Sequence, residues 1–300
     1  MDGGVGTLTV ASYNVRAGIG PGDFPVAWWR GVDEPRLLRM GTFLRQQDAD
    51  LVALQEVALG TVDGVAFDQS ALLGQVSGME HRYAAVHAVA LIEPETKRAV
   101  GASLWGNAVL SRFPIREAQT FALPTADDDD EVEPPSSDHE LRGVRFRDAP
   151  PGMREWRCVL ICEVEIGDQR LHFISTHLAH MGAGQRFSQA RRLGQLVAGI
   201  SGPVILAGDL NAPIESPELA PLRDSLTDSF SAQGTATGDG GRHSCGPYAI
   251  DHVLTRGLPP VACRVAREAG DASDHWPVVA RLALSAAAAA SESPTAEGQA

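Results

Sequence analysis

Asp209 and Asn211 stand two residues apart in the segment Gly-Asp-Leu-Asn, and their chemistry is the most informative in the chain. They follow the apolar run at residues 203–207, which is typical of a buried strand. A carboxylate at such a strand end can hold a hard cation, and an amide can steady a phosphate or an attacking water. Both residue types are also common turn formers after strands, so the pair alone does not predict a function.

The same pattern, a polar side chain after an apolar run, recurs along the chain. A further cluster, Ser-Asp-His-Trp-Pro at residues 273–277, precedes the last predicted strand. Because strand ends on one side of a sheet converge in space, residues far apart in the sequence can form one site. The other positions are Asn14 in S-Y-N-V-R, Glu56 in L-Q-E-V, Asn107 in G-N-A-V-L-S-R, His177 in S-T-H-L and Asp251 in I-D-H-V-L.

Oxygen donors dominate this set, and they predict a site for a hard divalent cation. Glu56 is expected to bind Mg²⁺ or Mn²⁺ together with one or more of Asn14, Asp209 and Asp274. The alternative interpretation of Glu56 is a strand-end carboxylate that caps the following segment.

Two histidines, His177 and His275, are placed to titrate near neutrality. Asp251 would orient His275 and stabilise its cation, as in a catalytic triad. His252 follows Asp251 on the same predicted strand, so its side chain is expected on the opposite face, in a packing role. The alternative for His177 is a core histidine bonded to a backbone carbonyl. A hard metal, acid–base imidazoles and amide donors together fit attack of water on phosphorus.

The bulk composition narrows the class of protein. With 300 residues, 44% of them hydrophobic, the chain can form one large domain or two small ones. Its formal net charge of −13 argues against a stable nucleic-acid partner, because such proteins usually carry a basic stripe. The start of the sequence lacks the features of a signal peptide, and no apolar stretch is long enough to span a membrane. Four cysteines without a Cys-x-x-Cys spacing predict reduced thiols and a cytoplasmic location: Cys158, Cys162, Cys245 and Cys263.

Strands outnumber helices in the predicted pattern, and few alternate strictly with them. This favours two packed sheets with helices outside. We expect residues 1–284 to form one domain, with an acidic inserted loop at 125–138 and a disordered tail at 285–300. Helices are predicted at 35–47, 67–76 and 185–200. Strands are predicted at 7–13, 50–54, 82–91, 108–110, 143–147, 157–166, 170–176, 203–207, 250–254, 261–267 and 277–284.

Seven motifs in one order carry a family resemblance. S-Y-N-V, L-Q-E-V, N-A-V-L-S-R, S-T-H-L, G-D-L-N, I-D-H-V and S-D-H-W-P closely resemble the endonuclease/exonuclease/phosphatase superfamily over about residues 7–284. The resemblance implies an α/β fold, the four-layer α/β/β/α sandwich of the deoxyribonuclease I type. It also implies metal-dependent hydrolysis of phosphate esters by an activated water.

The resemblance further implies a role for each matching residue. Glu56 would be the principal metal ligand, and Asn14 and Asp274 would support this metal site or a second ion. Asp209 and Asn211 would position the water and the phosphate, and His275 with Asp251 would form a base-like pair. His177 would contact the phosphate or aid the leaving group. Asn107 and Arg142 are further candidates for contact with the substrate phosphate, although Arg142 equally fits a solubilising role on an edge strand.

Three functions remain to be weighed. The first is a phosphodiesterase or phosphatase that acts on a lipid or small molecule, and the alternative is a nuclease acting on DNA or RNA. A non-catalytic binding protein on the same scaffold is less favoured, because such a scaffold would be expected to lose a metal-binding acid or a histidine. All six key side chains are present: Glu56, His177, Asp209, Asn211, Asp251 and His275.

Overall fold

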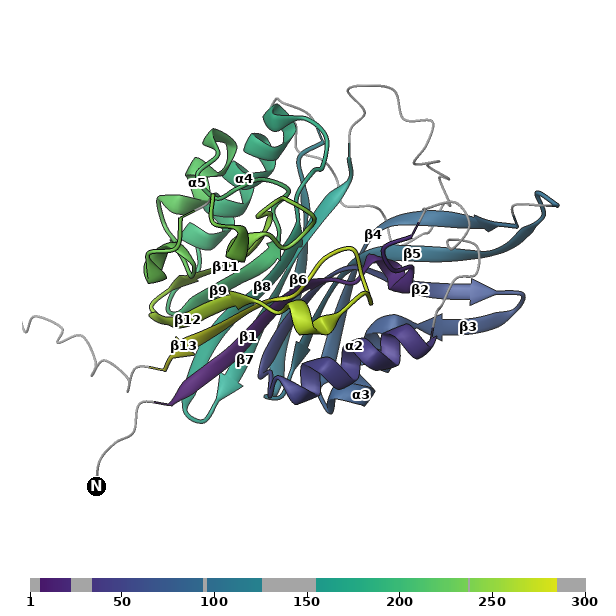
Figure 1. The fold of residues 1–300 in the computed structure, drawn as a ribbon, viewed down its shortest axis with the longest axis horizontal. Coiled ribbons are helices and arrows are strands. Elements are labelled where there is room, and N and C mark those ends of the chain that lie inside the picture. The colour runs from purple at the N-terminus through teal and green to yellow at the C-terminus, as the bar shows by residue number, and fades with distance from the viewer. Residues whose placement is uncertain (1–5, 23–33, 94–95, 126–154, 237, 285–300) are drawn as a thin grey trace, which may run out of the picture.

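Two mixed β-sheets pack face to face, and helices cover their outer faces (Figure 1). The computed structural model describes residues 6–22, 34–93, 96–125, 155–236 and 238–284. The packed sheets and their outer helices confirm the predicted four-layer α/β/β/α sandwich. The strand predicted at 143–147, Arg142, the tail at 285–300 and nearly all of the acidic loop at 125–138 lie outside the described residues.

The first sheet has the order β12-β13-β1-β2-β5-β4, and β3 pairs with β2. Its β1 and β2 run parallel, whereas its other neighbours are antiparallel. The strands are β1 (Thr7–Asn14), β2 (Leu51–Val62), β3 (Val65–Asp68), β4 (Glu80–Ile92), β5 (Ala99–Ser111), β12 (Pro260–Val265) and β13 (Val278–Ala283).

The second sheet has the order β10-β11-β9-β8-β7-β6, and only β8 and β9 among its described strands run parallel. Each sheet thus contains one parallel pair. The strands are β6 (Ile115–Leu123), β7 (Arg157–Ile166), β8 (Gln169–His177), β9 (Val204–Asp209), β10 (Thr227–Asp228) and β11 (Asp251–Arg256).

The helices bury apolar faces on the two outer sides of the sandwich (Figure 1). In α4, residues Ala190, Leu193 and Val197 recur at helical spacing and are buried against the second sheet. On the first sheet, α2 packs through residues such as Leu37. The helices are α2 (Glu34–Gln46), α3 (Gln69–Ser77), α4 (Ala183–Ala198) and α5 (Ala220–Arg223), with short 3-10 turns at Arg16–Gly18, Pro217–Leu219, Ser231–Gln233, Gly240–Arg242 and Arg267–Ala269.

The central core lies between the sheets and is formed by the inward side chains of both. It includes Val10 of β1, Phe173 of β8 and Val253 of β11, none of which is exposed. Fully burying one such side chain stabilises the fold by about 1.5–3 kcal/mol. This rigid interior fixes the strand ends from which the polar side chains project.

Several predicted boundaries were wrong. The helix predicted at 67–76 begins at Gln69, because Phe67 and Asp68 complete β3. Asp68 then caps the helix by accepting a hydrogen bond from the backbone N–H of Ala71. The strands predicted at 50–54 and 108–110 are far longer, since β2 and β5 pair antiparallel over most of their length. β3, β6 and β10 were missed.

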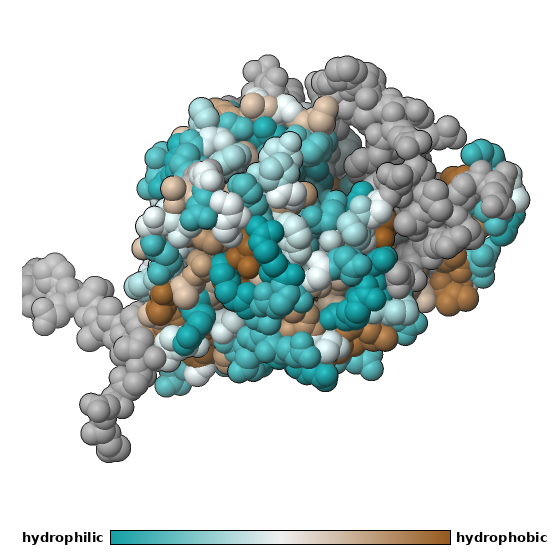
Figure 2. Space-filling model, viewed as in Figure 1, coloured by the Kyte–Doolittle hydropathy of each residue, from teal (hydrophilic) through white to brown (hydrophobic). Residues whose placement is uncertain are grey.

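The face of the molecule in Figure 2 is mostly hydrophilic, with hydrophobic side chains in scattered patches. Within the described ranges, no helix is both long and apolar enough to cross a bilayer. All four cysteines are free thiols.

Candidate active site

The predicted site residues meet where the two parallel strand pairs end. Asn14 lies beside Gln55 at the end of β1, and His177 lies beside Asp209 at the ends of β8 and β9. The Asn14 amide joins the sheets, because its Nδ2 donates to Glu56 Oε1 at 2.9 Å and to Asp209 Oδ2 at 3.1 Å. Its Oδ1 accepts from the backbone N–H of Arg16 at 3.0 Å. Asn14 therefore holds the two carboxylates in place with its nitrogen, while its oxygen points elsewhere.

A β-bulge positions Glu56. The register between β2 and β5 shifts between Leu54 and Val57, and Glu56 itself has a φ of 53°. A non-glycine residue in this left-handed region costs on the order of 1–3 kcal/mol and persists only where the surroundings impose it. The bulge turns the half-buried Glu56 carboxylate toward Asn14. The polar Gln-Glu pair thus interrupts β2 without ending it.

Asp209 and Asn211 form a tight turn after β9. The Oδ1 of Asp209 accepts from the backbone N–H of Asn211 at 2.9 Å, and Asn211 adopts a φ of 52°. The Asn211 Nδ2 lies 2.9 Å from His177 Nε2 and 2.9 Å from the Leu178 carbonyl oxygen. Asp209 and Asn211 therefore connect the ends of the parallel strands β8 and β9.

His177 is held in the neutral state. Burial lowers its pKa well below the usual range, and the positive charges of Arg157 and His275 push it in the same direction. A neutral ring can accept the Asn211 amide proton at Nε2. His177 is therefore a neutral hydrogen-bonding group at the centre of the site.

His275 is the opposite case, because its Nδ1 lies 2.8 Å from Asp251 Oδ2. Burial by itself lowers the pKa of His275, but the carboxylates of Asp251 and Asp209 and a hydrogen bond to Cys245 raise it well above the usual range. Asp251 lies at the start of β11 rather than after a strand. Antiparallel pairing nevertheless places it directly opposite Asp209 at the end of β9.

Negative charge is in excess at this point. Burial and the charge of Asp251 raise the pKa of Asp209, despite opposing contributions from His275 and Asn14. The Oδ1 of Asp251 is buried without a hydrogen-bond partner. Ligand atoms of Asp209, Asp251 and His275 lie within 4.8 Å of one another. Crowded carboxylates with an unsatisfied oxygen fit a hard divalent cation.

Two other predicted site residues make contacts within the protein. The hydrogen-bond and ion-pair partners of the Asp274 carboxylate are Ser273 and Arg16, whose Nε lies 3.3 Å away. Asn107 lies within β5, not at its end, and its Nδ2 donates to the Cys158 carbonyl oxygen across the two sheets at 3.0 Å. Its amide is thus committed to the core.

Sequence reasoning missed Arg157, which begins β7. Its side chain is 9% exposed and lies 2.5 Å from Glu155, and its Nε is buried without a hydrogen-bond partner. Arg157, Glu56 and His177 line the same small cavity. Its remaining lining residues are Val86, His87, Trp105, Gly106 and Asn107, of which His87 and Trp105 stack with ring centroids 6.2 Å apart.

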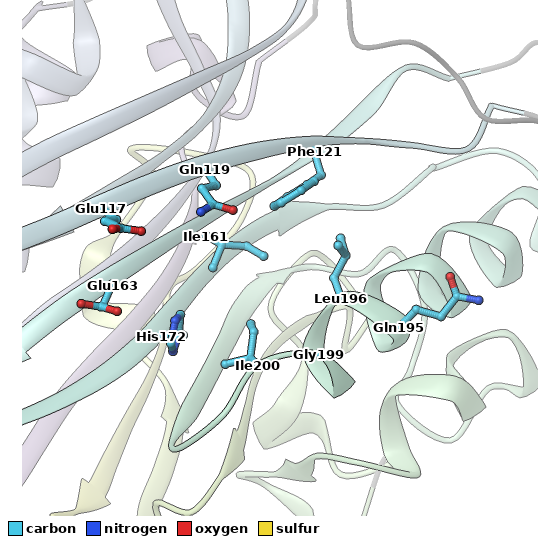
Figure 3. A pocket seen from close by; sticks show the side chains of 10 residues that line it. All are labelled: Glu117, Gln119, Phe121, Ile161, Glu163, His172, Gln195, Leu196, Gly199 and Ile200. Atoms are coloured by element: carbon cyan, nitrogen blue, oxygen red, sulfur yellow. The ribbon is translucent and has the colours of Figure 1, made fainter.

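A separate pocket of about 290 Å³ opens on the outer face of the second sheet, beside the end of α4 (Figure 3). None of the predicted site residues lines it. One lining residue, His172, lies five positions before His177 on β8. Because side chains alternate along a strand, the two histidines face opposite sides of the sheet. The lining residues are Glu117, Gln119, Phe121, Ile161, Glu163, His172, Gln195, Leu196, Gly199 and Ile200.

Structures of known proteins resemble this arrangement throughout the fold. An endonuclease/exonuclease/phosphatase from Beutenbergia cavernae superimposes with a TM-score of 0.66 at 21% identity, over 93% of this chain and 72% of that one. A mannosyl-6-phosphatase from Bacteroides thetaiotaomicron gives 0.59 at 20% identity, over 92% and 99%. TDP2 from Caenorhabditis elegans gives 0.58 at 17% identity, over 92% and 74%.

Because these sequence identities are low, the structural matches establish the fold alone. No curated protein sequence matches the chain. The model of the Endonuclease/Exonuclease/phosphatase family matches residues 11–275, which span every motif from Asn14 to His275. The chain therefore belongs to the endonuclease/exonuclease/phosphatase family and is a metal-dependent phosphoester hydrolase.

Proposed function

We propose that this protein hydrolyses phosphate esters of a lipid or small molecule with Mg²⁺ or Mn²⁺ as cofactor. The hydrogen-bonded chain from Glu56 through Asn14 and Asp209 to Asn211 and His177 carries this proposal. It brings metal-binding acids, amide donors and an imidazole to one point. Glu56 and Asp209 would hold the cation, which when bound neutralises charge and favours ionisation of a water.

The protonation states of His275 and Asp209 indicate which role each would have in the reaction. A general base must be unprotonated, and the raised pKa of His275 makes it a cation at neutral pH. His275, oriented by Asp251, therefore suits contact with a phosphoryl oxygen. Asp209, whose pKa is also raised, suits orientation and deprotonation of the attacking water. This reverses the base-like role that the sequence predicts for His275.

His177 and Asn211 would complete the phosphate site as neutral donors and acceptors. Arg157 would take the phosphate contact expected of Arg142, because a nearly buried guanidinium with an unpaired Nε faces the cavity beside Glu56. Arg157→Lys should lower turnover more than a surface change does, since Lys lacks the planar fork of donors.

The preference for a lipid or small molecule rests on charge. A net charge of −13 opposes binding of a long polyanion beyond the few contacts of the cleft. A nuclease remains the alternative outcome of the test. The proposal includes a catalytic domain at residues 1–284 and a cytoplasmic location, for which the free thiols provide support.

A substrate screen with and without metal tests this function. The purified chain would be incubated with p-nitrophenyl phosphate, its bis ester, phosphoinositides, sphingomyelin, RNA and DNA in Mg²⁺ or Mn²⁺. Glu56→Gln is expected to weaken metal binding without unfolding the protein. His252→Gln, on the other face of β11, is the matched control. Full turnover in excess chelator would reject the assignment, and faster cleavage of DNA or RNA would favour the nuclease.

A further inference from the structure

A thiol lies directly beside the candidate catalytic histidine. Cys245 forms an isolated antiparallel bridge with His275, and the backbone N–H of Trp276 donates to the Ser244 carbonyl oxygen at 2.7 Å. Cys245 itself closes a turn with Tyr248. These backbone contacts hold the half-buried Cys245 beside His275. The proposed hydrolysis gives this thiol no part in the reaction.

Three different metal ligands converge here. The Cys245 thiol, an Asp274 carboxylate oxygen and a His275 ring nitrogen lie within 4.8 Å of one another. The Nδ1 of His275 is engaged by Asp251 at 2.8 Å, whereas Nε2 lies 3.8 Å from Asp209 Oδ2, so Nε2 is the nitrogen that can turn to a metal. We propose that these three side chains form a second metal site for a thiophilic divalent cation such as Zn²⁺ or Cd²⁺, whose binding inhibits the enzyme. The inhibitory part rests on the proposed function, whereas the binding part does not.

Donor chemistry separates this site from the one at Glu56. Thiolate and imidazole are ligands that Zn²⁺ and Cd²⁺ prefer, whereas Mg²⁺ requires oxygen donors and gives up its waters reluctantly. Excess Mg²⁺ therefore should not displace the thiophilic ion. Binding forms a metal–sulfur bond and a metal–nitrogen bond, and it releases two protons to solvent, one from the Cys245 thiol and one from Nε2 of the His275 cation, with no change of oxidation state.

Inhibition follows from the shared histidine. When His275 Nε2 is bound to the metal, it can no longer contact a phosphoryl oxygen. Asp274 is available only in competition with Arg16, whose Nε lies 3.3 Å from it. This ion pair competes with the metal for the Asp274 carboxylate and so lowers the affinity of the site for the ion. Arg16→Gln should accordingly tighten binding of the thiophilic ion.

Cadmium titration in excess Mg²⁺ tests the site directly. One equivalent of Cd²⁺ is expected to give the ultraviolet charge-transfer band of a cadmium–thiolate bond. Cys245→Ser should abolish the band, and His275→Ala should weaken binding by at least the roughly 10–100-fold that loss of a supporting partner costs. Cys263→Ser is the matched control, because Cys263 is a second partly buried free thiol. It should leave the band unchanged.

Turnover measurements then test inhibition. Zn²⁺ added in excess Mg²⁺ should inhibit the wild-type protein and Cys263→Ser alike, and Cys245→Ser should resist at least about tenfold more Zn²⁺. A cadmium–thiolate band that survives in Cys245→Ser, or no band in the wild type, would overturn the site. Equal inhibition of Cys245→Ser would overturn its inhibitory role. Absence of any hydrolysis would count against the proposed function alone, since the cadmium band does not depend on it.

Discussion

Two Asp–His pairs lie on opposite faces of β11. The strand contributes one residue to each pair, and these two residues, Asp251 and His252, are adjacent in the sequence. In the first pair, Asp251 Oδ2 lies 2.8 Å from His275 Nδ1, and one carboxylate oxygen in each pair, Asp251 Oδ1 or Asp228 Oδ1, is buried without a hydrogen-bond partner. In the second, Asp228 Oδ1 lies 3.6 Å from His252 Nδ1, and His252 Nε2 lies 2.9 Å from the Ala212 carbonyl oxygen. Both pairs are buried. Residue types and burial are therefore the same, and the surroundings differ.

The difference is charge balance. Asp228 is compensated by the fully buried Arg242 at 3.0 Å and by two hydrogen bonds of 2.8 Å from Ser231. Burial raises the pKa of Asp228, but its contacts with His252 and Ser231 outweigh burial and lower it to about 2. Near Asp251, a second carboxylate adds to the charge instead. Balanced charge marks a structural pair, and unbalanced buried charge marks a site that can bind a cation or move a proton.

Removing the unbalanced pair should have the largest effect. His275→Ala is expected to slow single turnover by roughly 10²–10⁴-fold, because it removes a positioned cation from the phosphoryl group. Asp251→Asn should be similarly severe, since the His275 ring would lose its orientation and its charge support. Rapid-quench measurement of one turnover at saturating metal would give both rates.

Metal binding serves as the control for these variants. His275 supplies no carboxylate to the proposed Mg²⁺ site, so calorimetric Mg²⁺ affinity should largely survive in His275→Ala. A folded His275→Ala protein with the wild-type rate would remove the functional side of the comparison.

Breaking the balanced pair should affect stability instead. Asp228→Asn removes the closer of the two carboxylates beside the buried guanidinium of Arg242, since Glu215 lies 3.6 Å from it, and the loss should cost up to about 3–5 kcal/mol. The rate per folded molecule should change little, because Asp228 faces away from Asp209. Urea unfolding followed by circular dichroism would measure the loss. An Asp228→Asn protein as stable as the wild type would show that the ion pair contributes nothing.

Much of this contrast could be predicted from sequence. Asn14, His177 and Asp209 follow apolar runs, and parallel strands bring such positions to one edge. The opposite orientation of His252 follows from strand alternation alone. Partners on separate elements were harder to predict, because Asp228 lies in the two-residue strand β10 and Arg242 in a short 3-10 turn, and neither element is long enough to give a periodic signal.

Residues defined by pairing were missed for the same reason. Arg157 resembles any charged residue at a strand start until β7 is paired with β8, which brings it to His177. Cys245 faces His275 through one isolated bridge across 30 residues, which no local pattern encodes. β6 was missed because its first half, R-E-A-Q-T, is exposed and lacks an apolar face.

Lowering the pH should reduce the stabilisation by Asp228, with a smaller effect than the substitution. The folded-state pKa of Asp228, about 2, lies below the ordinary 3.8, so its stabilisation is present above pH 3.8 and is lost as the pH falls toward 2. The shift corresponds to about 2 kcal/mol. Urea unfolding between pH 5 and pH 2.5 should therefore show a smaller acid dependence in Asp228→Asn than in wild type. Identical pH slopes would contradict the lowered pKa.

The smallest effect is expected from His252→Gln. A glutamine amide can still donate to the Ala212 carbonyl oxygen, which follows Asn211 in the active-site turn, but it loses the contact with Asp228. One lost hydrogen bond costs about 0.5–1.5 kcal/mol of unfolding free energy. Single turnover should fall by less than about tenfold, or 1.4 kcal/mol of barrier. Both quantities would be measured beside His275→Ala. If a folded His252→Gln protein were as slow as His275→Ala, the two faces of β11 would not be separate in function, and unbalanced charge would fail as the criterion that distinguishes them.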